Sequence, residues 1–506
     1  MSAYDVRGES GILPSRPTTL YLLLATLAVI ICYVFYQFFL SPLRNVPGPY
    51  LARFTRLWEL NSLRAGNFQR TQIAYHEKYG PVVRIAPNRY SITDPAAFKT
   101  IYGHGSKFIK SKFYYAFGHP DLTKLDLFSE RDIASHALKR RRVSSLYSVT
   151  SLLSYEHFVD QNNLQLCSKL EQFAGTGRVF NVPTWMQYYA FDVIGSISVG
   201  KSFGYMEMET DPRGILSAIH ESMVYGSRVG LFPELHAPLA FVASKAKLPI
   251  PFDRVGDFIT EQINNRRSGK FTGVQGDFLD KLLDLKDAGK IEEWDIQTTI
   301  GANIAAGSDT TAITLSAILY FLIKHPEKAK KLHQEISEYA TSGKISDPVT
   351  FQEGQKMPYL TAVIKEALRL HPATGMILSR IVPSGGAVLG DYFFPAGSEV
   401  GCNPWLINAN ENIYGSDPRV FRPERWLEAS ESNSAAMDTN LFSFGTGART
   451  CIGKNISLLE VTKVIPQLFR KFEFVLENPN DEWGADCGWF VKQSFRCRVK
   501  VLASNM

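Results

Sequence analysis

A run of 21 residues without a charged side chain, residues 20–40, limits what this 506-residue chain can fold into. Only Thr26 and Gln37 in it are clearly polar. A helix of this length spans about 30 Å, the thickness of the hydrocarbon core of a bilayer. A cleaved signal peptide would have a shorter apolar region of roughly 7–15 residues and a small-residue cleavage site, and the run is followed by no such site. We therefore expect residues 20–40 to be a single transmembrane anchor, with residues 1–19 as a short tail before it.

The charges on either side of the run predict its orientation. Four arginines lie within residues 44–64 with few acids among them, whereas the two arginines before the run stand near Asp5 and Glu9. The positive-inside rule then places the rest of the chain on the cytosolic face. Residues 41–50 contain three prolines and are expected to form a stiff hinge.

Residues 51–506 are expected to form one large catalytic domain. They contain no Gly/Ser linker, no low-complexity block and no internal repeat. Amphipathic helical patterns dominate, and short β-like runs occur at residues 82–85, 89–92 and 387–394. These patterns predict a mainly α chain with small β-sheets, an α+β arrangement.

The segment FGTGARTCIG, residues 444–453, places one cysteine among residues that suit a metal-ligating thiolate. Gly447 permits a sharp turn beside a flat cofactor, and Phe444 can cover the Cys451 sulfur. Arg449 can pair with a carboxylate of that cofactor. After Gly453 the run from Asn455 is predicted to be a helix, and the partial positive charge at its N-terminus favours thiolate over thiol. The alternative for a lone cysteine is a buried structural thiol.

Three further segments accompany this one. Glu366 and Arg369 stand three apart on one face of a predicted helix, which alone would indicate an ordinary ion pair. Arg425 follows in FRPERW, and residues 301–311 read GANIAAGSDTT. These four segments, in the order that they take along the chain, resemble the cytochrome P-450 family of haem-thiolate monooxygenases. Residues 380–397 resemble fungal microsomal members, including the pisatin-demethylase-like group. The resemblance implies the cytochrome P-450 fold behind one transmembrane helix.

The resemblance implies haem b (iron protoporphyrin IX) with Cys451 as the axial ligand of the iron, in a loop that includes Phe444, Gly447, Arg449 and Gly453. His136, Arg140, Arg380 and Arg449 are expected at the haem propionates. His136 stands where most members have Trp, and its alternative is a surface helix histidine. Arg141 or Arg142 would replace Arg140 if the helix were shifted in register. Asn408 stands where many relatives have His. Glu366, Arg369 and Arg425 are expected to form a structural ion network.

The resemblance also implies the reaction. Asp309 and Thr310 are expected to deliver protons while O₂ is activated, so that one oxygen atom enters a lipophilic small molecule, in fungal secondary metabolism. The alternative for these two residues is a polar patch on a surface helix. Electrons are expected from NADPH through a membrane-bound NADPH–cytochrome P-450 reductase, with a cytochrome b-type protein as a second donor. The implied location is the endoplasmic reticulum membrane.

Residues that contact the substrate are expected in four places: an aromatic stretch, the central helix, a turn and the C-terminal loop. The candidates are Phe113, Tyr114, Asn303, Ala306, Thr374, Ile377 and Phe490. Each also suits ordinary core or loop packing.

Two other functions remain open at this point. A family member that rearranges peroxides needs neither O₂ nor a reductase, and such members often lose the acid–Thr pair that this chain keeps. A haem sensor or carrier would not need that pair. Nucleic-acid binding, which a net charge of +6 also suggests, is not expected, because the basic run at residues 139–142 is short and lacks interleaved aromatics.

Overall fold

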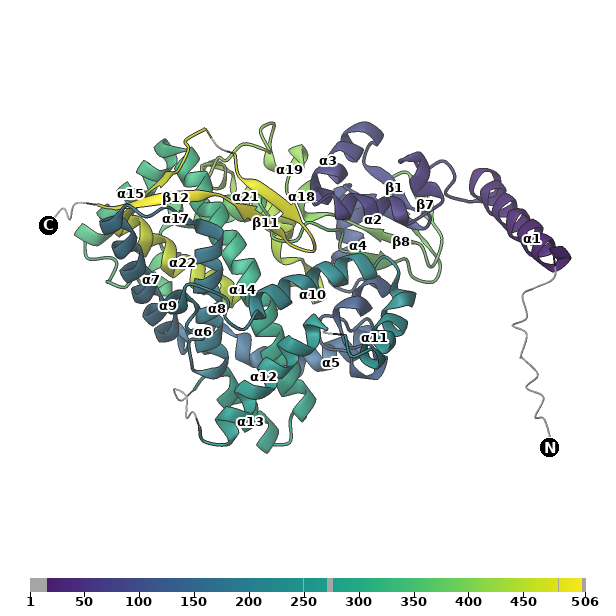
Figure 1. The fold of residues 1–506 in the computed structure, drawn as a ribbon. Helices are drawn as coiled ribbons and strands as arrows, with labels where there is room; N and C mark the ends of the chain where they lie inside the picture. The colour runs from purple at the N-terminus through teal and green to yellow at the C-terminus, as the bar shows by residue number, and fades with distance from the viewer. Residues whose placement is uncertain (1–15, 249, 271–275, 481, 503–506) are drawn as a thin grey trace, which may run out of the picture.

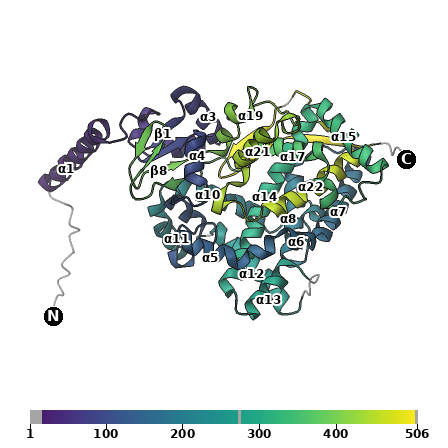
Figure 2. The same cartoon turned by 180° about the vertical axis from the view of Figure 1, so that it is seen from behind.

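Helix α14 (Glu293–Lys324) lies at the centre of the computed structural model, which describes residues 16–248, 250–270, 276–480 and 482–502. A helix that is apolar on all sides needs protein around it. The most apolar window of α14 is 72% buried. Helix α8 (Val182–Val199) covers one side and is itself buried throughout residues 189–199. Figures 1 and 2 both place α8, α14 and α22 (Lys454–Lys471) together in the middle of the molecule.

Helices make up most of the remaining chain, and their bounds follow. The other α-helices are α1 (Arg16–Phe35), α2 (Leu57–Arg64), α3 (Phe68–Tyr79), α4 (Pro95–Tyr102), α5 (Ile133–Val143), α6 (Val149–Leu153), α7 (Glu156–Thr176), α9 (Tyr205–Met208), α10 (Ile215–Val229), α11 (His236–Lys245), α12 (Pro251–Arg267), α13 (Phe278–Asp287), α15 (Pro326–Thr341), α16 (Phe351–Gln355), α17 (Pro358–Leu370), α18 (Pro404–Ile407), α19 (Glu411–Tyr414), α20 (Arg425–Glu428) and α21 (Glu431–Asn440). The π-helix is η1 (Tyr36–Leu40), and the 3₁₀ helices are η2 (Tyr50–Arg53), η3 (Lys112–Phe117), η4 (Leu122–Lys124), η5 (Ser144–Tyr147), η6 (Pro233–Leu235), η7 (Phe442–Phe444) and η8 (Gly447–Arg449).

Four small sheets complete the described chain. The largest has the order β1-β2-β8-β5-β3, and the others are β4-β12-β9, β10-β11 and β6-β7. The strands are β1 (Val82–Ala86), β2 (Arg89–Ile92), β3 (Ile109–Lys110), β4 (Phe180–Asn181), β5 (Arg380–Ile381), β6 (Ala387–Leu389), β7 (Tyr392–Phe394), β8 (Glu399–Gly401), β9 (Phe472–Leu476), β10 (Gly484–Cys487), β11 (Val491–Ser494) and β12 (Arg496–Val501). The prediction of a mainly α chain with small sheets is confirmed.

The expected β-like run at residues 387–394 is a hairpin of two strands. Strands β6 and β7 pair antiparallel, with Leu389 opposite Tyr392. The chain reverses at Gly390, whose φ of 56° lies in the left-handed region that glycine tolerates best. A run of apolar residues does not by itself reveal such a reversal.

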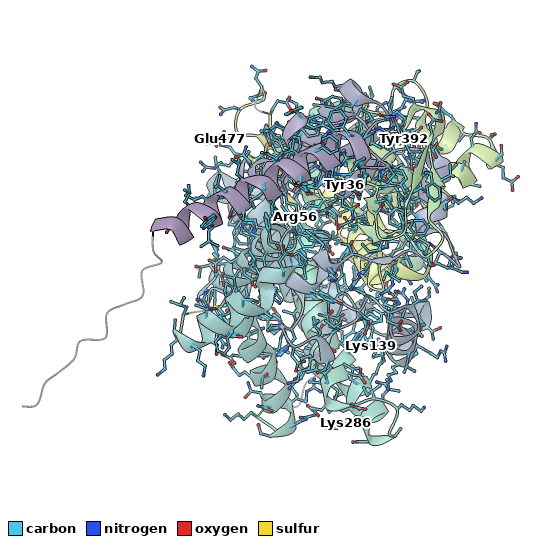
Figure 3. All side chains as sticks on the ribbon, turned by 90° about the vertical axis from the view of Figure 1, so that its right-hand side faces the viewer. Tyr36, Arg56, Lys139, Lys286, Tyr392 and Glu477 are labelled. Carbon is cyan, nitrogen blue, oxygen red and sulfur yellow. The ribbon has the colours of Figure 1, made fainter. Side chains whose placement is uncertain are left out.

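The N-terminal apolar helix extends away from the body (Figure 1). The stretch Thr19–Leu40 is long and apolar enough to cross a membrane, and its most apolar window is only 6% buried. Figure 3 looks onto the side that carries α1 and shows Tyr36 where this helix meets the body. There, the Arg84 guanidinium donates to the Gln37 side chain at 3.4 Å and to the Leu43 carbonyl at 2.6 Å. These bonds tie the residues that follow α1 to strand β1.

Candidate functional site

The loop before α22 holds Cys451 in a fixed backbone conformation. Gly447 has a φ of 65°, and a Cβ atom there would lie 2.1 Å from the Tyr102 carbonyl oxygen, so only glycine fits. The Cys451 amide donates to the Phe444 carbonyl at 2.8 Å. Phe444 is partly buried and packs against the main core. The loop backbone therefore holds the Cys451 side chain in a defined position.

The Cys451 thiol is surrounded by protein atoms yet remains exposed on one side. Burial has the largest influence on the pKa of the Cys451 thiol and raises it. The backbone N–H groups of Gly453 and Lys454 and the charge of Arg140 oppose that rise. A side chain that is closely surrounded but still exposed lies in a recess. A metal cation bound to the sulfur would act in the same direction as these donors, lowering the thiol pKa and favouring the thiolate.

A narrow exposed stripe runs along the otherwise buried helix α14. Ala302 and Ala306 are exposed and Thr310 is partly exposed, at intervals of four residues that share one face. The Thr310 hydroxyl donates to the Ala306 carbonyl at 2.8 Å. Gly307 lies off this stripe, because a Cβ atom there would meet Ile194 of α8 at 2.9 Å. Its small size is therefore explained by helix packing.

The stripe and Cys451 are linked through Tyr147 of η5. The Tyr147 hydroxyl donates to the Asn303 side-chain oxygen of α14 at 2.7 Å. Burial, and after it the charge of Cys451, raises the pKa of Tyr147. Cys451 thus lies close to the segment of α14 that carries the stripe.

Five basic side chains from separate parts of the chain converge beside this recess. Burial, and after it the charges of Arg449, Lys110, Arg140 and Arg380, together lower the pKa of His136 to about 3. Burial and then Arg380 lower the pKa of Arg449 to about 10. The sequence predicted four of the five. Lys110 was missed because a lysine in a two-residue strand gives no signal.

The hydrogen-bond partners of the three arginines are largely uncharged. Arg140 donates to the Thr450 carbonyl at 2.8 Å and Arg449 to the Glu130 carbonyl at 2.6 Å. Arg380 donates to the Ser379 carbonyl at 3.0 Å and to the Tyr114 hydroxyl at 3.4 Å. Carbonyl oxygens leave the net positive charge in place. A flat cofactor that carries two carboxylates and a thiolate-binding metal fits this site. Its metal would bind the Cys451 sulfur, and its carboxylates would neutralise the buried cations.

The predicted structural network lies in the core. Glu366 of α17 accepts from Arg369 at 2.8 and 2.9 Å, and from Arg425 of α20 at 2.9 Å. Trp426 also donates to this carboxylate, at 2.9 Å. Arg369 donates in addition to the Asn408 carbonyl at 2.8 Å. The network thus joins α17 to the chain around α20, and Trp426 is a member that the sequence did not predict.

Asp309 lies on a different face of α14 from Thr310. Its side chain is fully buried, and Lys492 of β11 is 3.0 Å from its Oδ1 atom. Gln187 of α8 also donates to Oδ1. The alternative of a polar patch on a surface helix does not fit Asp309, because its carboxylate is fully buried and a buried charge requires partners.

The predicted substrate contacts separate into groups. Phe113, Tyr114, Ile377 and Phe490 belong to one apolar cluster with Trp489, which the sequence did not predict. Thr374 pairs with Phe490 through a backbone bridge. Ala306 is on the exposed stripe, whereas Asn303 is buried and bonded to Tyr147. Contact of any of these residues with a substrate stays a prediction.

Comparison with known proteins gives consistent matches over nearly the whole chain. A family model described as Cytochrome P450 matches residues 47–501. A pisatin demethylase of Fusarium vanettenii is 41% identical over 472 residues, which is 92% of this chain and 90% of that protein. Cytochrome P450 monooxygenase cicH of Emericella nidulans is 34% identical over 92% of this chain and 94% of its own length. Cytochrome P450 monooxygenase gsfF of Penicillium aethiopicum is 33% identical over 97% of this chain and all of its own length.

Proposed function

Because this chain belongs to the cytochrome P450 family, we propose that it oxidises a lipophilic small molecule at the endoplasmic reticulum membrane with electrons from an NADPH–cytochrome P-450 reductase. It is a haem-thiolate monooxygenase, an oxidoreductase that uses haem and O₂. The observation that carries the finer proposal is the convergence of Cys451, the α14 stripe and five basic side chains at one recess.

Cys451 is the proposed axial ligand, and His136, Arg140, Arg380 and Arg449 are the proposed partners of the haem propionates. When bound, haem supplies the redox chemistry that activates O₂. The protein residues orient the group and neutralise its carboxylates. Phe444 limits the access of water to the sulfur, and Gly447 and Gly453 allow the loop its shape. Lys110 is a further proposed partner of the propionates, because its positive charge, like those of the arginines, acts on His136.

Asp309 and Thr310 are the proposed proton path. A hydroxyl both donates and accepts, so Thr310 can hold a water molecule on the exposed stripe. Asp309 would pass protons to that water from an adjacent face of α14, about 100° away around the helix. A member that rearranges peroxides, or a haem carrier, has no use for this pair. Their presence therefore favours a monooxygenase that consumes reductant.

Residues 20–40 are the proposed anchor, after the tail of residues 1–19, and residues 41–50 connect it to a catalytic domain of residues 51–506. The exposed apolar helix α1 supports this division. Exposed Phe241 and Val242 of α11 would add apolar contact with the membrane surface. A cytochrome b-type protein remains a second proposed electron donor.

The proposed substrate is a lipophilic compound of fungal secondary metabolism. Support comes from the aromatic cluster that contains Phe113, Tyr114 and Phe490 and from the fungal monooxygenases among the relatives. Two relatives are named for a demethylation of pisatin, and oxidative removal of a methyl group is one reaction within this proposal.

The test is the carbon-monoxide difference spectrum of the reduced full-length protein beside its Cys451→Ser variant, followed by NADPH consumption with added reductase. We expect a strongly red-shifted Soret band in the wild type and none in the variant. We also expect NADPH consumption that requires the reductase. Bound haem without the red-shifted band would overturn Cys451 ligation, and the band without any NADPH consumption would overturn the reductase proposal.

A further inference from the structure

A groove of about 360 Å³ lies on the surface where α15, α17 and α20 meet. Figures 1 and 2 both place α15 beside α17, and α20 packs against α17 as well. The lining residues Ala362 and Trp426 are buried, so the floor of the groove is apolar. Leu427 also lines the groove and is 48% exposed. Small-molecule sites commonly measure roughly 300–1,000 Å³ and are mostly apolar, so the groove has the size of a ligand site.

Tyr339 of α15 and Trp426 of α20 give the groove two aromatic rings. The Tyr339 hydroxyl donates to the Lys356 carbonyl at 2.9 Å, which fixes the ring beside the groove. The Trp426 indole N–H donates to Glu366 at 2.9 Å and is fixed in the same way. Aromatic rings favour stacked or edge-to-face contacts with another ring. The groove therefore suits a ligand with a flat aromatic body.

Three polar side chains of the groove offer hydrogen-bond donors that nothing in the described chain accepts. They are Gln355, Lys356 and Thr361, and none of them forms a side-chain hydrogen bond or an ion pair with a described residue. Lys344 adds a second ammonium, 5.2 Å from the centre of the Tyr339 ring and likewise without an ion pair among the described residues. A carboxylate only accepts hydrogen bonds and carries the opposite charge, so it matches these groups.

The acidic side chains beside the groove already have partners. The Asp438 carboxylate of α21 is 2.6 Å from the Lys365 ammonium. Glu335 of α15 accepts two backbone N–H groups at the start of α17, at 2.7 and 2.8 Å. Because these carboxylates are engaged elsewhere, the Lys356 ammonium keeps its positive charge for a ligand.

We propose that the groove binds a small aromatic carboxylate and that the bound molecule stabilises the Glu366 network. The ring of the ligand lies against Tyr339 and Trp426. Its carboxylate accepts hydrogen bonds from Lys356 and Thr361. Such a ligand contacts α15, α17 and α20 at once and opposes their separation.

The effect on the network follows from the position of its members. Glu366 belongs to α17, whereas Arg425 and Trp426 belong to α20. A ligand that holds α20 against α17 therefore keeps the carboxylate and its partners together, and the Cys451 loop retains its haem for longer. The binding site stands on the groove alone, whereas the effect on haem retention rests on the proposed function.

The first test is isothermal titration calorimetry of the full-length, haem-loaded protein with 2-naphthoate as the probe. We expect one molecule to bind with a dissociation constant below about 1 mM. The uncharged 2-naphthylmethanol should bind about fivefold more weakly. The Soret band should stay in place, because the groove is not at the haem. No binding at 1 mM, or a Soret shift that follows the binding curve, would overturn the site.

Variants locate the bound probe. Lys356→Glu reverses the charge that faces the carboxylate, and Leu427→Asp adds a negative charge beside it, so each should weaken binding about fivefold or more. Both side chains are exposed, and the carbon-monoxide spectrum checks that each variant is intact. Lys330→Glu, on an exposed part of α15 outside the groove, is the matched control and should bind like the wild type. Equal affinity in all three variants would place the probe elsewhere and overturn the site.

The second test measures the transfer of haem from the protein to excess apomyoglobin. We expect saturating 2-naphthoate to slow this transfer several-fold in the wild type and in Lys330→Glu, but not at the same concentration in Lys356→Glu. Binding by calorimetry with an unchanged transfer rate would overturn the stabilisation of the network. If the wild type holds no haem, the proposed function fails, and calorimetry of the same chain still decides whether the groove binds the carboxylate.

Discussion

Glu460 of α22 is completely buried, and neither of its carboxyl oxygens has a hydrogen-bond partner among the described residues. Burial raises its pKa well above 4.5. The residue is close enough to Tyr189 of α8 to raise the pKa of that phenol. An unpaired acid in the core is tolerated when it keeps its proton, because the neutral form costs less to bury.

This protonation makes stability depend on pH. The folded state holds a proton on Glu460 that the unfolded state releases above about pH 4.5. The free energy of unfolding of the wild type therefore falls by up to about 1.4 kcal/mol per pH unit, until the pH reaches the pKa of Glu460 in the folded state. Glu460→Gln is neutral at every pH and lacks this loss. Its advantage in melting temperature over the wild type should grow from pH 5 to pH 8. The Glu473 side chain of β9 is exposed, so Glu473→Gln should show no such trend. A Glu460→Gln advantage that shrinks with pH would contradict the assignment.

At the residue scale, the sequence predicted those positions that a local motif marks. Cys451 and Gly447 lie within ten residues of one another, and Glu366 and Arg369 within four. Lys492 was not predicted, because its contact with Asp309 joins positions 183 residues apart. Lys110 in its two-residue strand and Trp489 in the apolar cluster also stand in no local motif. Only the folded chain brings such residues together.

At the scale of elements, the Glu366 carboxylate connects α17 to α20. Arg369 and Arg425 both bind it, and their guanidinium groups also bind carbonyls of the connecting segment. Removing one partner would leave the others buried and incompletely paired. The network therefore fixes the position of the chain that leads into the Cys451 loop.

Arg369→Ala should cost about 3–5 kcal/mol of stability, the usual effect of breaking a buried ion pair, and should yield mostly haem-free protein. The measurement is the haem-to-protein ratio together with thermal unfolding. Arg419→Ala breaks an exposed pair with Glu77 and should change stability by less than about 0.5 kcal/mol. Normal haem content in Arg369→Ala would show that the network does not support the loop.

Helices and strands were predictable where the pattern of apolar residues was continuous along the sequence. Strand β2 (Arg89–Ile92) has the bounds expected for it, and α22 begins one residue before the predicted helix. The run at residues 387–394 was not resolved into a hairpin, since the reversal depends on the backbone of Gly390. Which residues of α14 stay exposed could not be predicted, because it depends on the surrounding helices.

At the scale of the whole molecule, α1 is the part that leaves the body, and it is the proposed attachment to the membrane (Figure 1). Deleting residues 1–35 removes α1 and keeps Gln37, which bonds to Arg84. We expect the truncated protein to be released from membranes by high salt, whereas the full chain resists it. The carbon-monoxide spectrum serves as the control for an intact body. Truncated protein that stays bound in high salt would assign the attachment to the body itself.

The cluster of basic side chains also bears on the steady-state amount of enzyme in a cell. Its members are His136, Lys110, Arg380 and Arg449. These groups depress one another's affinity for protons, so a newly made chain carries unrelieved repulsion in its interior. A bound dianion removes that repulsion and stabilises the fold by mass action. We therefore expect chains without bound haem to be less stable than haem-loaded chains and to be degraded faster in the cell. The amount of enzyme should then follow the supply of iron and porphyrin.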